Sequence, residues 1–229
     1  PLVASFIYNQ LKTIPNLRYT YKFIFVPETI GSIYYLSKNG ENLKENLTAG
    51  FVITCIGDPG VFTYKKSRRG DALPDRAAEI ILSQTEANFN IIDFFPSGSD
   101  ERQFCSPGFN LPVGSLIRTM YGKYPEYHTS GDNKDFISFQ AMEESVNKYL
   151  EIIDLIELNQ KYINTLPYCE PQLGKRGLYP TLGSQKGTES YVKAMMWILN
   201  LSDGENDLID ISLKSEIPIH ELKPVLFRL

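Results

Sequence analysis

Apolar residues follow two different spacings along residues 1–163, and the spacing changes from one segment to the next. Stretches rich in β-branched and aromatic residues predict strands at 19–26, 50–56, 61–65, 89–95 and 113–119. Apolar residues at helical spacing predict helices at 2–11, 29–36, 76–83 and 138–163. Asn39-Gly40 is expected to end the second of these helices, and Ser138 is expected to cap the start of the fourth. Because strands alternate with helices, we expect an α/β fold, a mostly parallel sheet with helices on both faces.

The pattern changes after this α/β part. Residues 169–187 are rich in Gly and Pro and predict a linker. Three short helical patterns follow at 191–201, 207–214 and 219–229, joined by predicted Ser-Asp-Gly and Ile-Pro turns. This arrangement is typical of the helical part of a winged-helix module. We therefore expect an α/β domain at 1–168, a linker at 169–187 and a winged-helix-like module at 188–229.

The third of these helices is the one that often reads DNA in winged-helix proteins. Its only cations are Lys223 and Arg228, which stand beside Glu221, so the sequence favours a protein-contact or packing role over nucleic-acid binding. His220 is expected to be a helix-start residue. The chain begins and ends inside helical patterns, so we expect both domains to be incomplete parts of a longer protein.

The composition limits the binding partners and the cellular compartment that we expect for this protein. The net charge of −4 gives no overall basic footprint for nucleic acid. The three cysteines are Cys55, Cys105 and Cys169, an odd number without paired spacing, which favours a reducing compartment and a cytoplasmic location. The sequence holds no run of about 18 apolar residues, so no membrane span is expected. Assembly into a homo-oligomer stays open.

Polar residues come directly after several of the predicted strands. Glu28, Asp58 and Asp100 each follow a strand closely, and His128, one of only two histidines, lies in the loop after another. In parallel sheets, ligands bind beyond the carboxyl ends of the strands. These four side chains therefore predict a functional site at one edge of the sheet.

The order of short motifs around these residues resembles a known superfamily. Ser99-Asp100-x-x-x-Phe104, then Gly108-x-x-x-Pro112, then Tyr127-His128-Thr129-x-x-Asp132 is similar to the C-terminal half of the co-catalytic zinc aminopeptidases. That superfamily also contains glutamate carboxypeptidase and glutaminyl cyclase. The sequence around these motifs, including PETIGS and EPQLGKRGLYP, resembles the bacterial aminopeptidase-like branch of that superfamily over roughly residues 1–180.

The resemblance implies roles for individual residues. His128 matches the ligand of one metal ion and Asp58 the ligand of the other, and zinc accepts both types of donor. Glu28 matches the general base, although Thr29 stands where the family has a second, metal-binding glutamate. Tyr127 is expected to donate to the oxyanion.

Two further residues belong to the substrate side of the predicted site. Asp100 is expected to support it, and Arg118 lies in the region where carboxypeptidase relatives hold a substrate carboxylate. The residues by themselves also allow an ordinary structural role for each candidate: a polar loop residue at His128, turn residues at Asp58 and Asp100, a helix N-terminal acid at Glu28, an aromatic core residue at Tyr127, and a surface ion pair at Arg118.

Two functions remain open from the sequence. The first is a zinc-dependent aminopeptidase-like hydrolase of small peptides or amino-acid conjugates, which uses metal-activated water and a glutamate general base. The second is a non-catalytic binding or regulatory protein with a peptidase fold. The family's other metal ligands, an upstream histidine and a bridging aspartate, are not supplied by residues 1–229. We therefore expect one or two zinc ions in the intact protein, and an incomplete, inactive site in this chain.

Overall fold

The computed structural model describes residues 1–178 and 188–229, which form two compact units, Pro1–Glu157 and Leu158–Leu229. The sequence predicts the boundary at residue 168. The structure divides earlier because a strand at Lys161–Ile163 pairs within the second unit. Part of the expected linker, residues 179–187, lies outside the described residues.

The first unit is built on a mixed four-stranded sheet. Its strands are β1 (Gly50–Phe51), β2 (Phe62–Lys65), β3 (Phe89–Ile92) and β4 (Val113–Ile117), in the order β1-β4-β2-β3. The pairs β1–β4 and β2–β3 are parallel, whereas β2–β4 is antiparallel. The α/β fold is confirmed, and the sheet is mixed where the sequence predicts a mostly parallel one.

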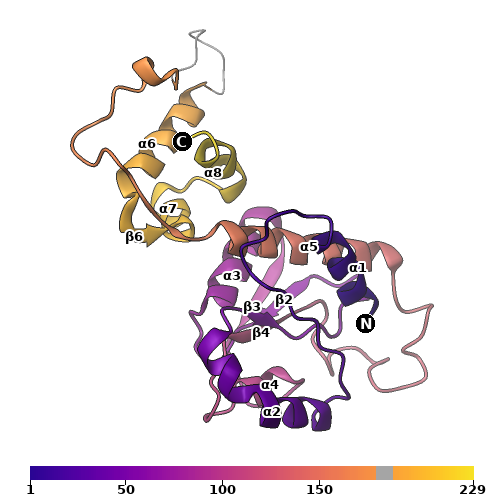
Figure 1. Ribbon diagram of the computed structural model, residues 1–229. Coiled ribbons are helices and arrows are strands. Elements are labelled where there is room, and N and C mark those ends of the chain that lie inside the picture. The colour runs from indigo at the N-terminus through magenta and orange to yellow at the C-terminus, as the bar shows by residue number, and fades with distance from the viewer. Residues whose placement is uncertain (179–187) are drawn as a thin grey trace. The chain divides into compact units, whose positions relative to one another are not determined.

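Helices cover the two faces of this sheet (Figure 1). Helices α3 (Leu73–Thr85) and α5 (Phe139–Leu158) lie on one face, with α1 (Leu2–Leu11) beside α5. Helices α2 (Ile30–Asn46) and α4 (Glu101–Phe104) lie on the other. Tyr149 of α5 packs against Phe51 and donates its hydroxyl to the carbonyl oxygen of Leu116 at 2.8 Å, so this face is fixed by both packing and a buried hydrogen bond.

The helix starts follow from short-range chemistry. Pro74 stands in the first turn of α3, where a missing amide hydrogen has no cost. Ser138 precedes α5, and its hydroxyl accepts a hydrogen bond from the amide of Ala141 at 3.2 Å, which confirms the predicted N-cap. The far end of α5 differs from the prediction, because the helix stops at Leu158 and the next residues turn into a strand.

Helix α2 runs well past the predicted stop at Asn39-Gly40. Gly40 is buried inside the helix, and a β-carbon there would come within 2.2 Å of the Phe109 ring. The glycine therefore serves close packing instead of ending the helix. Leu36, one turn earlier, joins the buried cluster of Cys105, Leu111 and Val113.

One predicted strand is absent. Residues 20–26 are extended but join no sheet, and no backbone–backbone hydrogen bond within the described residues involves them. The side chain of Phe25 is exposed. The predicted strand at 50–56 is also shortened to Gly50–Phe51, where the amides of Gly50 and Val52 donate to the carbonyl oxygens of Pro112 and Gly114. A β-rich pattern forms a ladder only where a partner strand lies alongside.

Within its described residues, the second unit contains a two-stranded antiparallel sheet and three α-helices. Strands β5 (Lys161–Ile163) and β6 (Asp203–Asp207) pair with one another, so the Ser-Asp-Gly segment predicted as a turn leads into a strand. Helices α6 (Thr188–Leu201), α7 (Leu208–Ser215) and α8 (Ile219–Leu226) confirm the predicted helical set. Asp207 caps α7, accepting the amide hydrogen of Asp210 at 2.9 Å.

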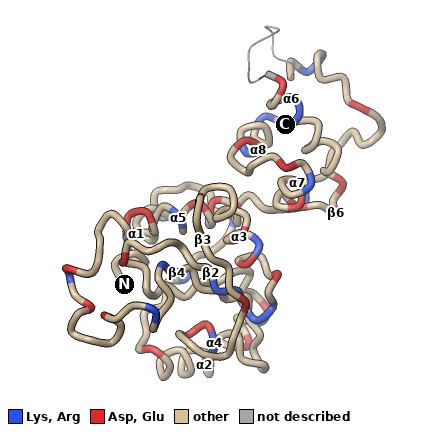
Figure 2. The backbone as a smooth tube through the Cα atoms, turned by 180° about the vertical axis from the view of Figure 1, so that it is seen from behind, with Lys and Arg blue, Asp and Glu red and all other residues tan. Residues whose placement is uncertain are grey.

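Both signs of charge occur along the described residues of the second unit. Figure 2 shows acidic and basic residues interspersed along its described segments. His220 is exposed at the start of α8, where the sequence places it as a helix-start residue. Within the described ranges, no helix combines the length and the apolar character that crossing a membrane requires.

Candidate functional site

An open cavity of about 800 Å³ lies in the first unit between the extended residues 18–26 and the segment 46–54. Its floor is apolar and includes Ile7, Tyr149 and Ile153. Glu28, Ser99 and Asp100 line its wall. Two of the predicted site residues, Glu28 and Asp100, thus share one cavity although they are far apart in the sequence.

A hydrogen bond joins the loops that carry these two acids. The carboxylate oxygen Oδ1 of Asp100 accepts the backbone amide hydrogen of Thr29 at 2.7 Å. Arg102 donates to the hydroxyl of Thr29 at 3.1 Å. Thr29 has φ of +64°, a backbone conformation that β-branched residues rarely adopt, so these contacts hold a strained residue directly after Glu28. Asp100 therefore supports the turn that carries Glu28.

An aromatic cluster contains the other predicted catalytic residue. The rings of Tyr127 and His128 are stacked with centroids 3.9 Å apart, and Tyr124 meets Tyr127 edge to face at 5.6 Å. The hydroxyl of Tyr124 donates to the sulfur of Cys55 at 3.5 Å. Cys55 and His128 both have positive φ, +46° and +57°. Together with Thr29, these residues make three strained positions among the segments that carry the predicted site.

The electrostatics link this cluster to Glu28. Burial raises the pKa of the Tyr127 phenol, and the charges of Cys55 and Glu28 raise the pKa further. Burial also raises the pKa of Tyr124, and so do Cys55, Asp132 and Asp58. The negative charge of Glu28 thus favours the neutral form of the Tyr127 phenol, which is the form that can donate a hydrogen bond.

Asp58 is buried and closes a turn. Its Oδ2 atom accepts the amide hydrogen of Gly60 at 3.0 Å and the hydroxyl hydrogen of Thr119. Thr119 also directs its backbone amide to both carboxylate oxygens of Asp58. The carboxylate is thus surrounded by hydrogen-bond donors from Gly60 and Thr119, as expected for the turn residue that the sequence offers as the alternative to a metal ligand.

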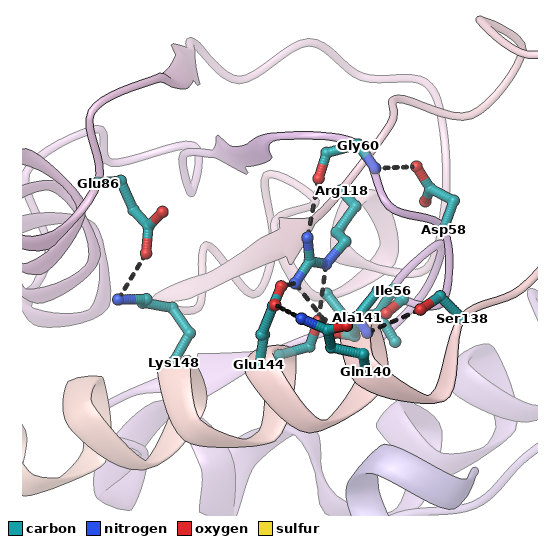
Figure 3. Close-up of polar contacts among 11 residues, drawn as sticks. Ile56, Asp58, Gly60, Glu86, Arg118, Ser138, Gln140, Ala141, Glu144 and Lys148 are labelled. Carbon is teal, nitrogen blue, oxygen red and sulfur yellow. Dashed lines mark hydrogen bonds and ion pairs between the residues drawn. The ribbon is translucent and has the colours of Figure 1, made fainter.

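Arg118 is buried and points into the fold (Figure 3). Its guanidinium donates to Ser145 and Ala141 of α5 and to the carbonyl oxygen of Gly60, all at 2.9 to 3.0 Å, and pairs with Glu144 at 2.8 Å. It also covers the ring of Phe62. Arg118 therefore joins the end of β4 to α5, and neither the surface ion pair nor the substrate contact weighed from the sequence describes this position.

A buried ion pair that was not predicted from the sequence lies next to the loop of Asp100. Lys65 and Glu101 are fully buried, and the Lys65 ammonium lies 2.7 Å from the Glu101 carboxylate. Lys65 also donates to the carbonyl oxygen of Ser97 at 2.5 Å. A lysine within the apolar run of a central strand is the signal that could have identified this pair, because a buried lysine requires a partner.

The residues that the structure describes do not form a zinc site. No group of three or more His, Cys, Asp and Glu side chains within residues 1–178 and 188–229 could hold a metal ion. Asp58 is engaged by Gly60 and Thr119, and His128 lies stacked on Tyr127 in an exposed loop. The implied zinc is therefore not matched by the donors that these residues bring together.

Comparisons with known proteins agree with the two-unit structure. Residues 1–159 match a family described as "Domain of unknown function (DUF4910)", and residues 160–229 match a winged helix-turn-helix family. A Clostridium acetobutylicum protein, provisionally named as a polysaccharide biosynthesis protein with aminopeptidase-like domain, is 47% identical over 221 residues, which are 96% of this chain and 50% of that protein.

Solved structures extend the comparison. A crystal structure from Clostridium acetobutylicum, provisionally described as a peptidase, has a TM-score of 0.88 at 44% identity and covers 99% of this chain and 50% of that one. This chain thus spans about half the length of these relatives. BSAP, a zinc aminopeptidase from Bacillus subtilis, shares the fold with a TM-score of 0.56 at 15% identity, over 67% of this chain and 39% of that one. The resemblance to aminopeptidase-like proteins with a winged-helix module is confirmed.

Proposed function

This chain belongs to the DUF4910 family, and we propose that it is part of a peptidase-type hydrolase of small peptides or amino-acid conjugates. Its relatives are described as aminopeptidase-like or as a peptidase, which supports this reaction class. The observation that carries the proposal is the hydrogen bond from the Thr29 amide to Asp100, because it fixes the turn of Glu28 on the cavity wall.

In the proposed reaction, Glu28 is the general base. It is exposed and lines the cavity, so its carboxylate can take the proton of an attacking water and later return it to the leaving amine. Tyr127, whose phenol is protonated at physiological pH, donates its hydroxyl hydrogen to the oxyanion that develops on the substrate carbonyl. Asp100 orients the turn of Glu28 and does not itself touch the reacting atoms.

We propose a role for zinc only in a longer protein that contains this chain. The fold is shared with a zinc aminopeptidase, but no group of three donors converges among the described residues, so we assign no step to the metal. Asp58 and His128 keep the proposed roles, each as a ligand of a different metal ion, only if residues outside this sequence complete the two metal sites. Arg118 is left out of the substrate site, because its donors are used within the fold.

The test is hydrolysis of aminoacyl-arylamides by the natural protein that contains this chain, with and without a chelator. Glu28→Gln is expected to lower kcat by about 100- to 10,000-fold, the usual contribution of a general base. Glu41→Gln, a change on the exposed side of α2, is the matched control and should leave kcat unchanged. Full activity of the Glu28 variant would remove the proposed base.

A binding or regulatory protein is the second candidate. The inward-facing Arg118 and the Asp58 turn favour it, because two of the predicted site residues serve the fold. A natural protein that binds a small peptide in equilibrium dialysis, yet cleaves none with zinc added, would select this candidate over the hydrolase.

A further inference from the structure

We propose that Lys65 and Glu101 are positioning residues: by holding the turn 97–101 from below, they set the place of the Thr29 amide and hence of Glu28 at the cavity. Any effect of this position of Glu28 on catalysis rests on the proposed function. The link between the buried ion pair and the Glu28 turn is a property of the fold and can be measured without any activity.

Lys65 connects the first and the last residue of the turn. Its ammonium donates to the carbonyl oxygen of Ser97 at 2.5 Å and to the Oε1 atom of Glu101 at 2.7 Å. The third donor meets the hydroxyl of Tyr121 at 3.1 Å, and the ring of Phe95 lies 3.7 Å from the ammonium. The ammonium is thus fully used, and both ends of the turn are fixed to β2.

Glu101 is fixed from a second strand. Its other carboxylate oxygen accepts the hydroxyl hydrogen of Ser115 of β4 at 3.3 Å. Both members of the pair are fully buried, and transfer of two charges out of water opposes most of the attraction between them. A pair of this kind contributes little net stability compared with apolar residues of the same size, so its main effect is to define one geometry.

The side chain of Tyr121 packs closely against the turn at Gly98. Gly98 has φ of +117°, and a β-carbon there would come within 1.8 Å of the Tyr121 hydroxyl. The same hydroxyl donates to the carbonyl oxygen of Ser97 at 3.3 Å. Tyr121 and Lys65 therefore hold the turn from two sides, and a shift of either moves the turn.

The opposite side of this turn reaches the Glu28 loop. Asp100, the neighbour of Glu101, accepts the Thr29 amide hydrogen at 2.7 Å, and Arg102 donates to the Thr29 hydroxyl at 3.1 Å. Thr29 keeps its strained backbone only while these contacts last. Loss of the buried pair frees the turn, weakens both contacts and lets the Glu28 loop relax.

Amide hydrogen exchange of the 229-residue chain, followed by NMR, tests this link. In Lys65→Met, the Thr29 amide should exchange at least roughly tenfold faster than in the original chain, measured below the rate of global unfolding. Lys148→Met is the matched control. Lys148 is also buried and pairs with Glu86 and Glu151, but it lies on α5 and touches no residue of the turn. Its loss should leave the exchange of Thr29 unchanged.

A second variant protects the test against unfolding. Replacing both partners, Lys65→Met with Glu101→Leu, leaves no unpaired buried charge and should preserve the fold. Thr29 should again exchange faster. If Thr29 exchanges no faster in this double variant than in Lys148→Met, the positioning role is wrong and the pair is merely structural. If the exchange responds while the natural protein cleaves no peptide, the positioning link stands and only the proposed hydrolase fails.

Discussion

The carboxylate of Asp58 accepts the hydroxyl hydrogen of Thr119, a residue 61 positions later in the chain. The contact joins the loop after β1 to the loop after β4, two strands that run parallel and end at the same edge. The same carboxylate accepts the amide hydrogen of Gly60, so the turn and the neighbouring loop share one acceptor.

Substitution of Asp58 should therefore lower stability. Asp58→Ala leaves the amide of Gly60 without its acceptor and is expected to cost about 1–3 kcal/mol in the free energy of unfolding. Thr119→Val should cost about 1 kcal/mol, and the double variant less than the sum, with a coupling of about 0.5–3 kcal/mol. Urea denaturation measures these values. Asp71→Ala, at an exposed site, is the control, and additive effects at 58 and 119 would contradict the contact.

Arg118 should behave as a structural residue as well. Arg118→Met removes the hydrogen bonds that the guanidinium donates to Ser145, Ala141 and Gly60. We expect it to lower the free energy of unfolding by about 3 kcal/mol. Arg68→Met, which removes a single exposed hydrogen bond to Asn110, should change the free energy by less than about 0.5 kcal/mol. Equal midpoints for the two variants in thermal unfolding would speak against the buried position of Arg118.

The two glycines of the loops around α4 should respond in opposite ways. Gly98→Ala places a β-carbon against Tyr121 in a backbone conformation that suits glycine, so a loss of about 1–3 kcal/mol or more is expected. Gly108→Ala meets no atom within 4 Å and has no such backbone constraint, so a gain of about 0.4–1 kcal/mol is expected from reduced freedom of the unfolded chain. Urea denaturation followed by circular dichroism measures the free energy of unfolding of both variants and shows whether they change in opposite directions.

Zinc should not bind tightly to the 229-residue chain. Its described His, Cys, Asp and Glu residues include no group that could hold a metal, so dialysis after zinc loading should leave no stoichiometric metal by mass spectrometry. His128→Ala and the control His220→Ala should behave alike. One equivalent of retained zinc that disappears only in the His128 variant would restore His128 as a ligand in this chain.

Acid should weaken the second unit through Asp203. The amides of Glu205 and Asn206 donate to its carboxylate, and these bonds, with Asn206 the larger cause, hold its pKa below the usual value. A lowered pKa in the folded state contributes stability above the unfolded pKa of about 3.9, and that contribution is lost as the pH falls through the folded pKa. In Asp203→Asn, this pH dependence should vanish. NMR titration of the carboxyl carbon checks the direction.

Local sequence signals predicted much of the first unit. The helix at 2–11 and the N-cap at Ser138 follow from spacing and short-range hydrogen bonding, and both are observed. Gly40 shows where such reasoning ends, because its role depends on Phe109, which lies far away in the sequence. The apolar run at 20–26 fails for a related reason, since a strand needs a neighbour and none lies alongside it within the described residues.

The candidate site was predictable only in part. Strand-end logic and resemblance selected Glu28 and Asp100, and both line the cavity. The partners of Asp58 and Arg118 come from other loops and from α5, so no local motif could show that these side chains face inward. Whether Glu28, Tyr127, Asp58 and His128 act in catalysis or metal binding stays a prediction.

The extended segment 20–26 pairs with no strand, and β1 has no partner strand on its outer side, within the described residues. Exposed apolar side chains such as Phe25 accompany these unpaired backbone amide and carbonyl groups. Such edges template intermolecular pairing. Concentrated solutions of this chain by itself should therefore form oligomers whose light scattering grows with time, and a charged residue introduced at 25 should delay that growth. The rate at which the light scattering grows therefore reflects how many backbone hydrogen-bonding groups at this edge of the sheet have no partner strand.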